Sequence, residues 1–463
     1  MKPFQGKNYK LKYIFDGYCM LKNIGKQLIN LTKNSNYFKN HIYLQILASV
    51  NNIIFPLSFN ICFYCLKMTV LKFFFWFSLF IVFYSYIGYG ILLFFLVQIK
   101  KIFVAAKPKN TGSEQFEPEI SLIVSAYNEQ DFIERKIENT LKLTYPADKL
   151  KIIFITDGSS DSTAQIISRY QNIILLHNPE RKGKLAAMNR AMQFVNTPYV
   201  VFSDANTLLN TDCIKEVVKH YANPSVGGVA GEKKVINDFE NTAAGVGEGL
   251  YWKYESFLKK LDSSFYSVVG AAGELFSVRT DLFEKEEKNV IIEDFVQSLK
   301  ICMKGYVIRY EPNAYAIETS SASMKDEEKR KIRICAGAFQ AMGILKGLFN
   351  IFKYPVLSFQ FISHRILRWT LCPLCLVILL LVNSIIAISA DELIYRVIMA
   401  LQIVFYICAL IGWFYANKNI KLKILYVPYY FLFMNIAVFL GLKRFLMKQQ
   451  TVLWEKAARQ GVA

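Results

Sequence analysis

The chain has 463 residues, of which 53% are hydrophobic and 15% aromatic, and its formal net charge is +19 at pH 7. So large an apolar share argues against an ordinary soluble protein and favours one good-sized domain combined with membrane segments. No basic stripe interleaved with aromatic residues indicates nucleic-acid binding, so we attribute the positive charge to basic residues that face anionic membrane lipids.

The N-terminal part, residues 1–67, is basic and rich in asparagine. No small-residue cleavage site follows its apolar stretch 53–66, so the pattern is not that of a signal peptide. We expect this segment to be an extension and translation to begin at Met68, directly before an apolar run. Peptides from upstream of Met68 in mass spectrometry would contradict that expectation.

A first membrane helix is predicted within residues 68–100. The run from about Leu71 to Val97 carries a single charge, near its start. A bilayer core requires roughly 20 such apolar residues. The basic and polar segment 101–118 then indicates a linker to the next part of the chain.

A domain over residues 119–342 is predicted by four apolar runs, each followed by a helical pattern. Such alternation indicates an α/β fold with a mostly parallel sheet and helices on both faces. The four runs are SLIVSA, KIIFIT, NIILLH and YVVFSD.

Polar side chains follow each of these four runs. Asp and Asn often end strands by bonding to their own backbone, so turn chemistry explains any one of them. The carboxyl ends of parallel strands meet at one edge, however, and ligands bind there. Carboxylates, an amide oxygen and a lysine together suit a nucleotide diphosphate with Mg²⁺ or Mn²⁺. The expected residues are Asn128, Glu129, Asp157, Lys184, Asp204 and Asn206, the last two as metal ligands.

The C-terminal part, residues 366–446, contains two to three further membrane helices. They cover about Ile366–Ser389, Leu393–Ala416 and Leu422–Leu446, and the last could also be re-entrant or interfacial. An interfacial helix region is expected over 343–365, with Gly343–Tyr354 as its amphipathic part, and a basic tail over 447–463. Lys and Arg beside the spans place the central domain in the cytoplasm and the Ala390–Glu392 link outside.

Nine cysteines include two Cys-x-x-Cys pairs, at Cys62 and at Cys372. Both pairs lie in apolar segments with no second pair or His group nearby. Buried reduced thiols are therefore a better interpretation than zinc ligands.

Several ordered motifs follow one another from about Ser121 to Gly337. They are AYNE (Ala126–Glu129), TDGSSD (Thr156–Asp161), RKGK (Arg181–Lys184), SDAN (Ser203–Asn206), GAAGELFSVR (Gly270–Arg279) and IIED (Ile291–Asp294). In this order they resemble the membrane-integrated family 2 glycosyltransferases, which include cellulose, hyaluronan and poly-N-acetylglucosamine synthases. The resemblance implies a glycosyltransferase-A fold and a UDP-sugar bound by residues that include Ala126, Asn128, Glu129 and Asp157, with the diphosphate near Lys184.

The resemblance also implies the catalytic carboxylate. An acceptor hydroxyl is a poor nucleophile at neutral pH, so a carboxylate must take its proton. Asp294, beside Glu293, is the expected base, although both acids also suit the first turn of the following helix. Gly270 and Gly273 correspond to the acceptor-side loop.

The chain departs from the family pattern at two places. Asn206 replaces the second metal-binding aspartate. Where polymerising members have Gln-x-x-Arg-Trp, this chain has Arg330-Lys331-Ile332-Arg333-Ile334, without the Trp. Arg365-Ile366-Leu367-Arg368-Trp369 is a second candidate, although Arg and Trp also mark membrane interfaces. Position in the chain favours Arg330 and Arg333.

The leading hypothesis is an inverting, inner-membrane hexosyl- or N-acetylhexosaminyltransferase that extends a β-linked polysaccharide on a saccharide acceptor. An export or accessory subunit would be a further partner. Transfer of one sugar to a lipid-linked acceptor is the first alternative. A catalytically silent nucleotide-binding scaffold of an export complex is the second. The aromatic stretch Glu248–Asp262 is interpreted as packing against the sheet or lying on the membrane.

Overall fold

The computed structural model describes residues 62–103, 116–236, 243–285, 290–319, 321, 323–417 and 423–449. The predictions for residues 1–61, for 104–115 of the linker and for 450–463 of the tail lie outside these ranges. The chain divides into two compact units, Met1–Phe73 and Phe74–Ala463. The sheet and the helices that surround it belong to the second unit.

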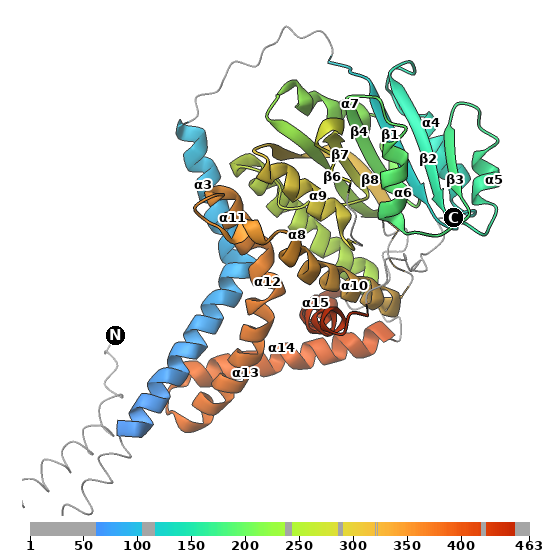
Figure 1. The fold of residues 1–463 in the computed structure, drawn as a ribbon. Helices are drawn as coiled ribbons and strands as arrows, with labels where there is room; N and C mark the ends of the chain where they lie inside the picture. Colours follow the sequence, from blue (N-terminus) through green and yellow to red (C-terminus); the bar gives the residue numbers. More distant parts are fainter. Residues whose placement is uncertain are drawn as a thin grey trace, which may run out of the picture. The chain divides into compact units, whose positions relative to one another are not determined.

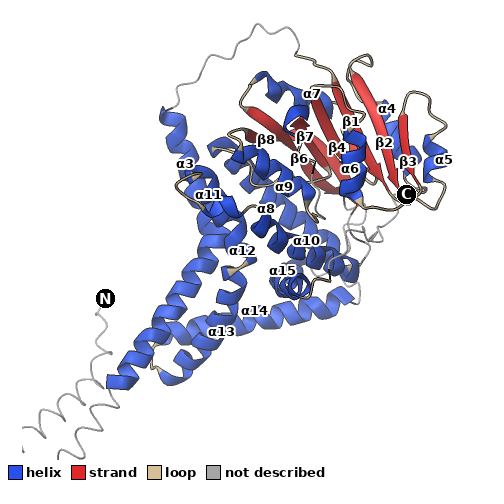
Figure 2. Ribbon diagram, viewed as in Figure 1, coloured by secondary structure: helices blue, strands red, loops and turns tan. Residues whose placement is uncertain are grey.

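An eight-stranded mixed sheet forms the centre of the described part of the second unit, in the order β3-β2-β1-β4-β7-β6-β8-β5 (Figures 1 and 2). β1 pairs in parallel with β2 and β4, and β2 pairs in parallel with β3. The strands are β1 (Ile120–Ala126), β2 (Leu150–Asp157), β3 (Ile174–Asn178), β4 (Tyr199–Asp204), β5 (Leu208–Leu209), β6 (Val226–Ile236), β7 (Leu275–Arg279) and β8 (Val307–Thr319).

Helices cover both faces of the sheet, as the α/β fold class predicted. Side chains alternate between faces along a strand. Ile123 therefore packs in one core with α6 (Lys184–Met192) and α9 (Glu293–Met303). Leu122 packs in the other core with α4 (Ile133–Leu141), α5 (Thr163–Ile167) and α7 (Cys213–Val218). Burial on both faces explains why β1 and β4 are continuous apolar runs, whereas β3, at the edge of the sheet, is partly exposed.

The second half of the sheet differs from the first. β7 runs antiparallel to β4 and β6, and β5 runs antiparallel to β8, whereas β6 and β8 are parallel. The four repeating units did not predict these strands, because they alternate with longer helices and loops. The sheet is therefore mixed but mostly parallel, and β7 and β5 are its antiparallel strands.

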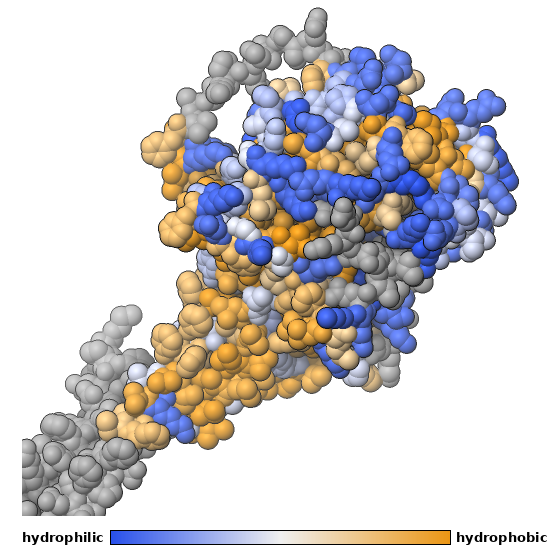
Figure 3. Space-filling model, viewed as in Figure 1, coloured by the Kyte–Doolittle hydropathy of each residue, from blue (hydrophilic) through white to orange (hydrophobic). Residues whose placement is uncertain are grey.

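Four helices in the described part of the chain are long and apolar enough to cross a membrane. They are the helix Cys62–Phe103, α13 (Leu371–Ser389), α14 (Leu393–Asn417) and α15 (Lys423–Leu446). Figure 3 shows apolar side chains gathered over α13 and α14, whereas polar side chains cover much of the sheet domain. α14 exposes large apolar residues along its length, including Val397, Leu401, Val404 and Ile407. The chain therefore has the helices of a membrane protein.

Further helices and turns complete the described part of the chain. The sequence predicted one amphipathic helix over Gly343–Tyr354, and this prediction is wrong. α10 ends at Ile344, and a 3₁₀ turn and a bend follow it. The remaining elements are π-helix η1 (Tyr84–Gly88), α3 (Tyr89–Phe103), η2 (Lys219–Ala222), α8 (Ala243–Phe265), η3 (Thr280–Leu282), α10 (Met324–Ile344), η4 (Lys346–Phe349), α11 (Pro355–Phe361), π-helix η5 (Ile362–Ile366) and α12 (Leu367–Trp369).

Candidate active site

A cavity of about 870 Å³ opens at the carboxyl edge of β1 and β4 and extends between α8, α10 and α12. Most of the residues that were predicted for the site from sequence line this cavity. The predicted residues on its wall are Glu129, Lys184, Asp204, Asn206, Gly273, Glu293, Asp294, Arg330 and Arg333. Strand ends, two helix N-termini and α10 therefore meet at one place.

Lys184 lies at the centre of this cluster. Its Nζ is 2.7 Å from Oδ1 of Asp204 and 3.1 Å from Oε1 of Glu293. Burial lowers the pKa of Lys184, but the charges of Asp204, Glu293 and Asp294 outweigh burial and raise that pKa above its ordinary value. Lys184 is thus a permanent ammonium group in contact with the carboxylates.

Asp294 stands in the first turn of α9, next to Glu293. Its Oδ1 accepts a hydrogen bond of 2.8 Å from the backbone N–H of Phe295. Burial and the neighbouring Glu293 carboxylate raise the pKa of Asp294 to about 7, although Lys184 opposes that shift. A carboxyl group with this pKa exchanges a proton near neutral pH, which a general base must do.

Gly273 leaves the space between Lys184 and Asp294 open. A methyl group at this position would lie 2.9 Å from Nζ of Lys184 and 3.4 Å from Oδ2 of Asp294. Any residue with a side chain would therefore fill the gap between cation and carboxylate. Gly270, three residues earlier, does not line the cavity. Its φ is +88°, and a methyl group there would collide with the ring of Phe295.

The described residues fit the predicted metal site only in part. Oδ1 of Asn206 is buried and has no hydrogen-bond partner among the described residues, so this oxygen is available to a ligand. Asp204 supplies a carboxylate two residues away, and burial raises its pKa against the effect of Lys184. No group of three or more His, Cys, Asp or Glu in the described ranges forms a metal site by itself. A divalent cation would therefore need oxygens from its nucleotide as well.

The Asp204–Asn206 turn is held from behind by Lys136 of α4, a residue that the sequence interpretation missed. Lys136 Nζ donates to Ser203 Oγ at 2.9 Å and to the carbonyl oxygen of Thr207 at 2.8 Å. Its side chain is fully buried, and burial lowers the pKa of Lys136 to about 7. The sequence pattern that could have identified Lys136 is a lysine on the apolar face of a helix, between Ile133 and Ile137.

Ala126, Asn128 and Asp157 lie at the strand ends but do not line the cavity. Asp157 accepts backbone hydrogen bonds from Lys182 at 3.0 Å and Gly183 at 2.6 Å, so it shapes the basic loop that leads to Lys184. Asn128 Oδ1 accepts from the backbone of Ser160, which ties the first two strand-end turns together. Direct contacts of these three residues with a nucleotide stay predictions.

Arg365 and Trp369 also line the cavity, together with Arg330 and Arg333. The interpretation of Arg365-to-Trp369 as a membrane-interface marker is therefore incomplete. Arg365 and Arg368 are both buried, and Trp369 packs against Phe295 with ring centroids 5.3 Å apart. Both candidates for the Arg-containing motif contribute to the same wall.

Helix α8 supplies a further wall that the sequence interpretation assigned to packing or to the membrane surface. Its cavity-lining residues are Tyr251, Trp252, Glu255 and Lys259. Other residues that the sequence did not single out are Glu274 and Glu318, which line the cavity and are both paired with the buried Lys233. Lys233, Glu274 and Glu318 lie on three different strands or loops that are distant in sequence, so spacing alone could not group them.

Comparison with known proteins identifies the central part of the chain. Residues 121–286 match the family model described as "Glycosyl transferase family 2". Residues 121–286 are thus similar to family 2 glycosyltransferases. These residues include β1 to β7 and therefore the strand ends that carry Lys184, Asp204 and Gly273.

Curated relatives of the glycosyltransferase domain include poly-β-1,6-N-acetyl-D-glucosamine synthases. One from Staphylococcus aureus is 27% identical over 265 residues, which are 54% of this chain and 62% of that protein. One from Staphylococcus epidermidis is 26% identical over 302 residues, which are 61% of this chain and 71% of that protein. The chain therefore matches less than two thirds of the length of the Staphylococcus aureus relative.

A solved structure shares the fold. A mannosyltransferase from Pyrobaculum calidifontis, in complex with GDP-mannose and Mn²⁺, superposes with a TM-score of 0.58 and 21% identity. The superposition covers 81% of this chain and 99% of the mannosyltransferase. The likeness confirms the glycosyltransferase-A type of sheet that the sequence predicted.

Proposed function

We propose that the protein is a membrane-bound inverting glycosyltransferase that transfers a sugar from a nucleotide sugar to a growing β-linked polysaccharide. The observation that carries the proposal is the meeting of Lys184, Asp204 and Asp294 around the open space at Gly273. A cation for the diphosphate, a metal-binding carboxylate and a base thereby lie within one cavity.

The donor side is formed by Lys184 and the Asp204–Asn206 turn. The Lys184 ammonium would bind the diphosphate and stabilise the charge that develops as the nucleotide leaves. Asp204 and the unpartnered Asn206 Oδ1 would hold Mg²⁺ or Mn²⁺, which supplies further positive charge to the leaving diphosphate. Homology to poly-N-acetylglucosamine synthases supports UDP-N-acetylglucosamine as the first donor to test.

Asp294 acts as the base on the opposite side of Gly273. It takes the proton of the acceptor hydroxyl as that oxygen attacks the anomeric carbon, and the bond to the diphosphate breaks. One displacement inverts the anomeric centre, so an α-linked donor gives a β-linked product. A silent scaffold would need no base, which is why the raised pKa of Asp294 favours an enzyme.

Transfer of a single sugar to a lipid-linked acceptor is the second candidate. The cavity wall includes Trp369 at the start of the C-terminal helices and Met434 of α15. An acceptor that approaches from the bilayer could therefore reach the base directly. Ile334 of α10 stands where polymerising relatives would have Trp, and this departure is the sequence observation that supports the lipid-acceptor candidate.

The product distinguishes these candidates. Membranes that contain the wild-type chain or Asp294→Asn are incubated with labelled nucleotide sugars and Mg²⁺ or Mn²⁺, and lipid-extractable product is separated from high-mass polymer. Base-dependent polymer is the expected result. Base-dependent glycolipid would assign the lipid acceptor, and no transfer from any donor would favour the scaffold. Asp148→Ala, on an exposed loop, is the matched control and should leave product formation unchanged.

A further inference from the structure

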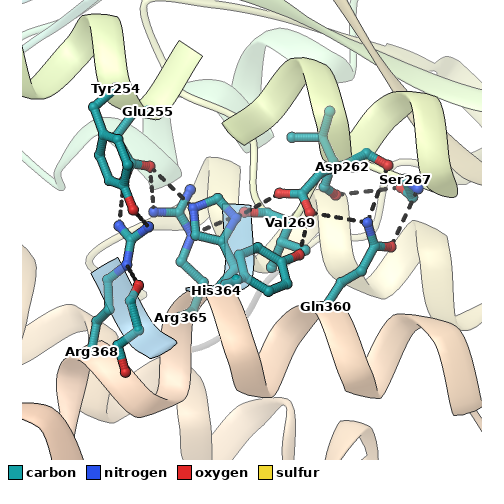
Figure 4. Close-up of polar contacts among 12 residues, drawn as sticks. Tyr254, Glu255, Asp262, Ser267, Val269, Gln360, His364, Arg365 and Arg368 are labelled. Atoms are coloured by element: carbon teal, nitrogen blue, oxygen red, sulfur yellow. Dashed lines mark hydrogen bonds and ion pairs between the residues drawn. The ribbon is translucent and has the colours of Figure 1, made fainter. Parts of the chain in front are cut away.

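A buried network of charged groups joins α8 to η5 and α12 (Figure 4), and its members Glu255 and Arg365 line the cavity. At its centre is Glu255 of α8, which is 1% exposed. Arg365 Nη1 donates to Oε2 of Glu255 at 2.8 Å, and Arg368 Nη1 donates to Oε1 at 2.5 Å. Burial raises the pKa of Glu255, but the two guanidinium groups outweigh burial and hold that pKa well below its usual range. Each carboxylate oxygen therefore has its own arginine.

Arg365 also binds the acceptor-side loop. Its Nε donates to the carbonyl oxygen of Val269 at 3.1 Å, so one guanidinium group joins α8 to this loop. Elsewhere in the loop, the N–H of Ser267 donates to Gln360 Oε1 at 3.4 Å, and the N–H of Ala271 donates to Ser298 Oγ at 3.1 Å. The loop Ser267–Gly273 is thus held from α11 and η5 on one side and from α9 on the other.

The same loop ends at the reacting groups. Gly270 packs so closely on Phe295 that no side chain fits between them, and Phe295 follows Asp294 directly in α9. Gly273 borders both Lys184 and Asp294. A shift of the loop at Val269 would therefore change the space in which the acceptor meets the base.

The network continues to the membrane helix that precedes the domain. Arg368 Nε donates to the carbonyl oxygen of Ser85 at 3.3 Å, within the π-turn η1. A second π-turn, η5, carries Arg365 and faces the first, with Tyr84 Oη 2.9 Å from Ser363 Oγ. Short π-helical segments such as η1 and η5 are frequent at functional sites when they interrupt α-helices.

A second buried carboxylate strengthens this contact. Asp262 of α8 accepts from Tyr89 Oη at 2.5 Å and from Gln360 Nε2 at 3.0 Å, and its Oδ2 lies 2.6 Å from His364 Nδ1. These partners come from α3, α11 and η5, so one carboxylate ties three elements to α8. The elements that hold the loop are therefore fixed relative to the membrane helix as well.

We propose that Arg365 is a positioning residue for sugar transfer, because it holds the loop Ser267–Gly273 against α9 by binding Val269 and Glu255 at the same time. The inference rests on the proposed function and gives Arg365 a role beyond that of a membrane-interface marker. The proposed donor side consists of Lys184 on α6 and the Asp204 turn after β4. These residues are not members of the network around Glu255. Loss of the network should consequently lower the rate of transfer rather than the affinity for the nucleotide.

Arg365→Lys tests the proposal. Lysine keeps the positive charge, but its ammonium group lacks the planar fork from which Arg365 reaches Val269 with Nε and Glu255 with Nη1. With the full chain purified in detergent, we expect kcat to fall at least tenfold, while the Kd for the nucleoside diphosphate with Mg²⁺ changes less than twofold. Arg396→Lys, at an exposed arginine paired with Asp391, is the matched control and should change neither value.

Glu255→Gln is the second variant, since it keeps the shape of the side chain and removes its charge. It should give the same loss of kcat with unchanged nucleotide affinity. A normal kcat in either folded variant would overturn the inference alone. Failure of both variants to fold, or equal losses of kcat and of nucleotide binding, would also overturn it and assign the network a purely structural role. No transfer by the wild-type chain would instead overturn the proposed function, and this inference with it.

Discussion

Lys184 and the carboxylates around it form one small cluster that suits the site both before and after a donor binds. Before a donor binds, Asp204 and Glu293 neutralise the buried ammonium group. A diphosphate brings its own negative charge and suits the same cation. The cluster therefore exchanges one set of anions for another without leaving a buried charge uncompensated.

The pKa of Asp294 leads to a prediction about pH. Because the pKa is raised to about 7, the carboxyl group is protonated below that pH and cannot accept the acceptor proton. We expect kcat/KM to reach a plateau above pH 7 and to fall toward tenfold per pH unit below it. Initial rates between pH 5.5 and 8.5 measure this. The residual rate of Asp294→Asn should not follow the same curve, and a wild-type profile that stays flat down to pH 5.5 would exclude Asp294 as the base.

Asp204 leads to a prediction about metal binding. Asp204→Ala removes the carboxylate and leaves Asn206 as the neighbouring oxygen. We expect the enhancement of UDP binding by Mn²⁺ to fall by about tenfold or more, because charged ligands dominate the affinity for hard cations. Titration calorimetry with and without Mn²⁺ measures the effect. Metal-dependent binding equal to that of the wild type would move the metal site elsewhere, whereas Asp294→Asn should retain it.

At the scale of elements, the site depends on where helices begin. Lys184 is the first residue of α6, and Glu293 and Asp294 are the first two of α9. Acidic residues suit a helix N-terminus, so the structural and catalytic interpretations of Glu293 and Asp294 are compatible. Short helices packed on the sheet thereby place a cation and a base on opposite sides of Gly273.

The acceptor-side loop leads to a prediction at this scale. Gly270→Ala places a side chain at φ +88° and against the Phe295 ring. We expect a loss of roughly 2–4 kcal/mol in unfolding free energy, from backbone strain and overpacking together. Thermal unfolding in detergent measures it. Gly305→Ala is a useful comparison, because Gly305 also has positive φ but has open space where its side chain would lie. Gly270→Ala should destabilise more, and equal losses would show that packing on Phe295 contributes nothing.

At the scale of the whole molecule, basic residues beside the apolar helices lead to a prediction about orientation. We expect the glycosyltransferase domain to face the cytoplasm and the link at Asp391 to face outside. An impermeant thiol reagent should label Asp391→Cys in intact cells but label Lys142→Cys only after permeabilisation. The unmodified chain sets the background, since it has cysteines of its own. Labelling of Lys142→Cys in intact cells would reverse the orientation.

Much of this arrangement was predictable from sequence. The apolar runs of β1 and β4 are buried on both faces, so their hydrophobicity alone indicates strands, whereas the edge strand β3 is partly exposed. The polar ends of all four parallel strands must meet at one edge. Lys184, Asp204, Glu293 and Asp294 were all expected at the site, and all line the cavity. The antiparallel β7 was not predicted, because nothing in a short apolar run states the direction of its neighbour.

The sequence by itself determined the α/β domain, the apolar helices and the motifs of the donor side, because each depends on residues close together in the chain. Only the tertiary structure decided the rest of the cavity. Trp369 and Glu255 are more than 100 positions apart, and both lie on the wall because Arg368 of α12 binds Glu255 and Tyr254 of α8. Such contacts arise from packing between distant elements, which neither periodicity nor motif spacing encodes.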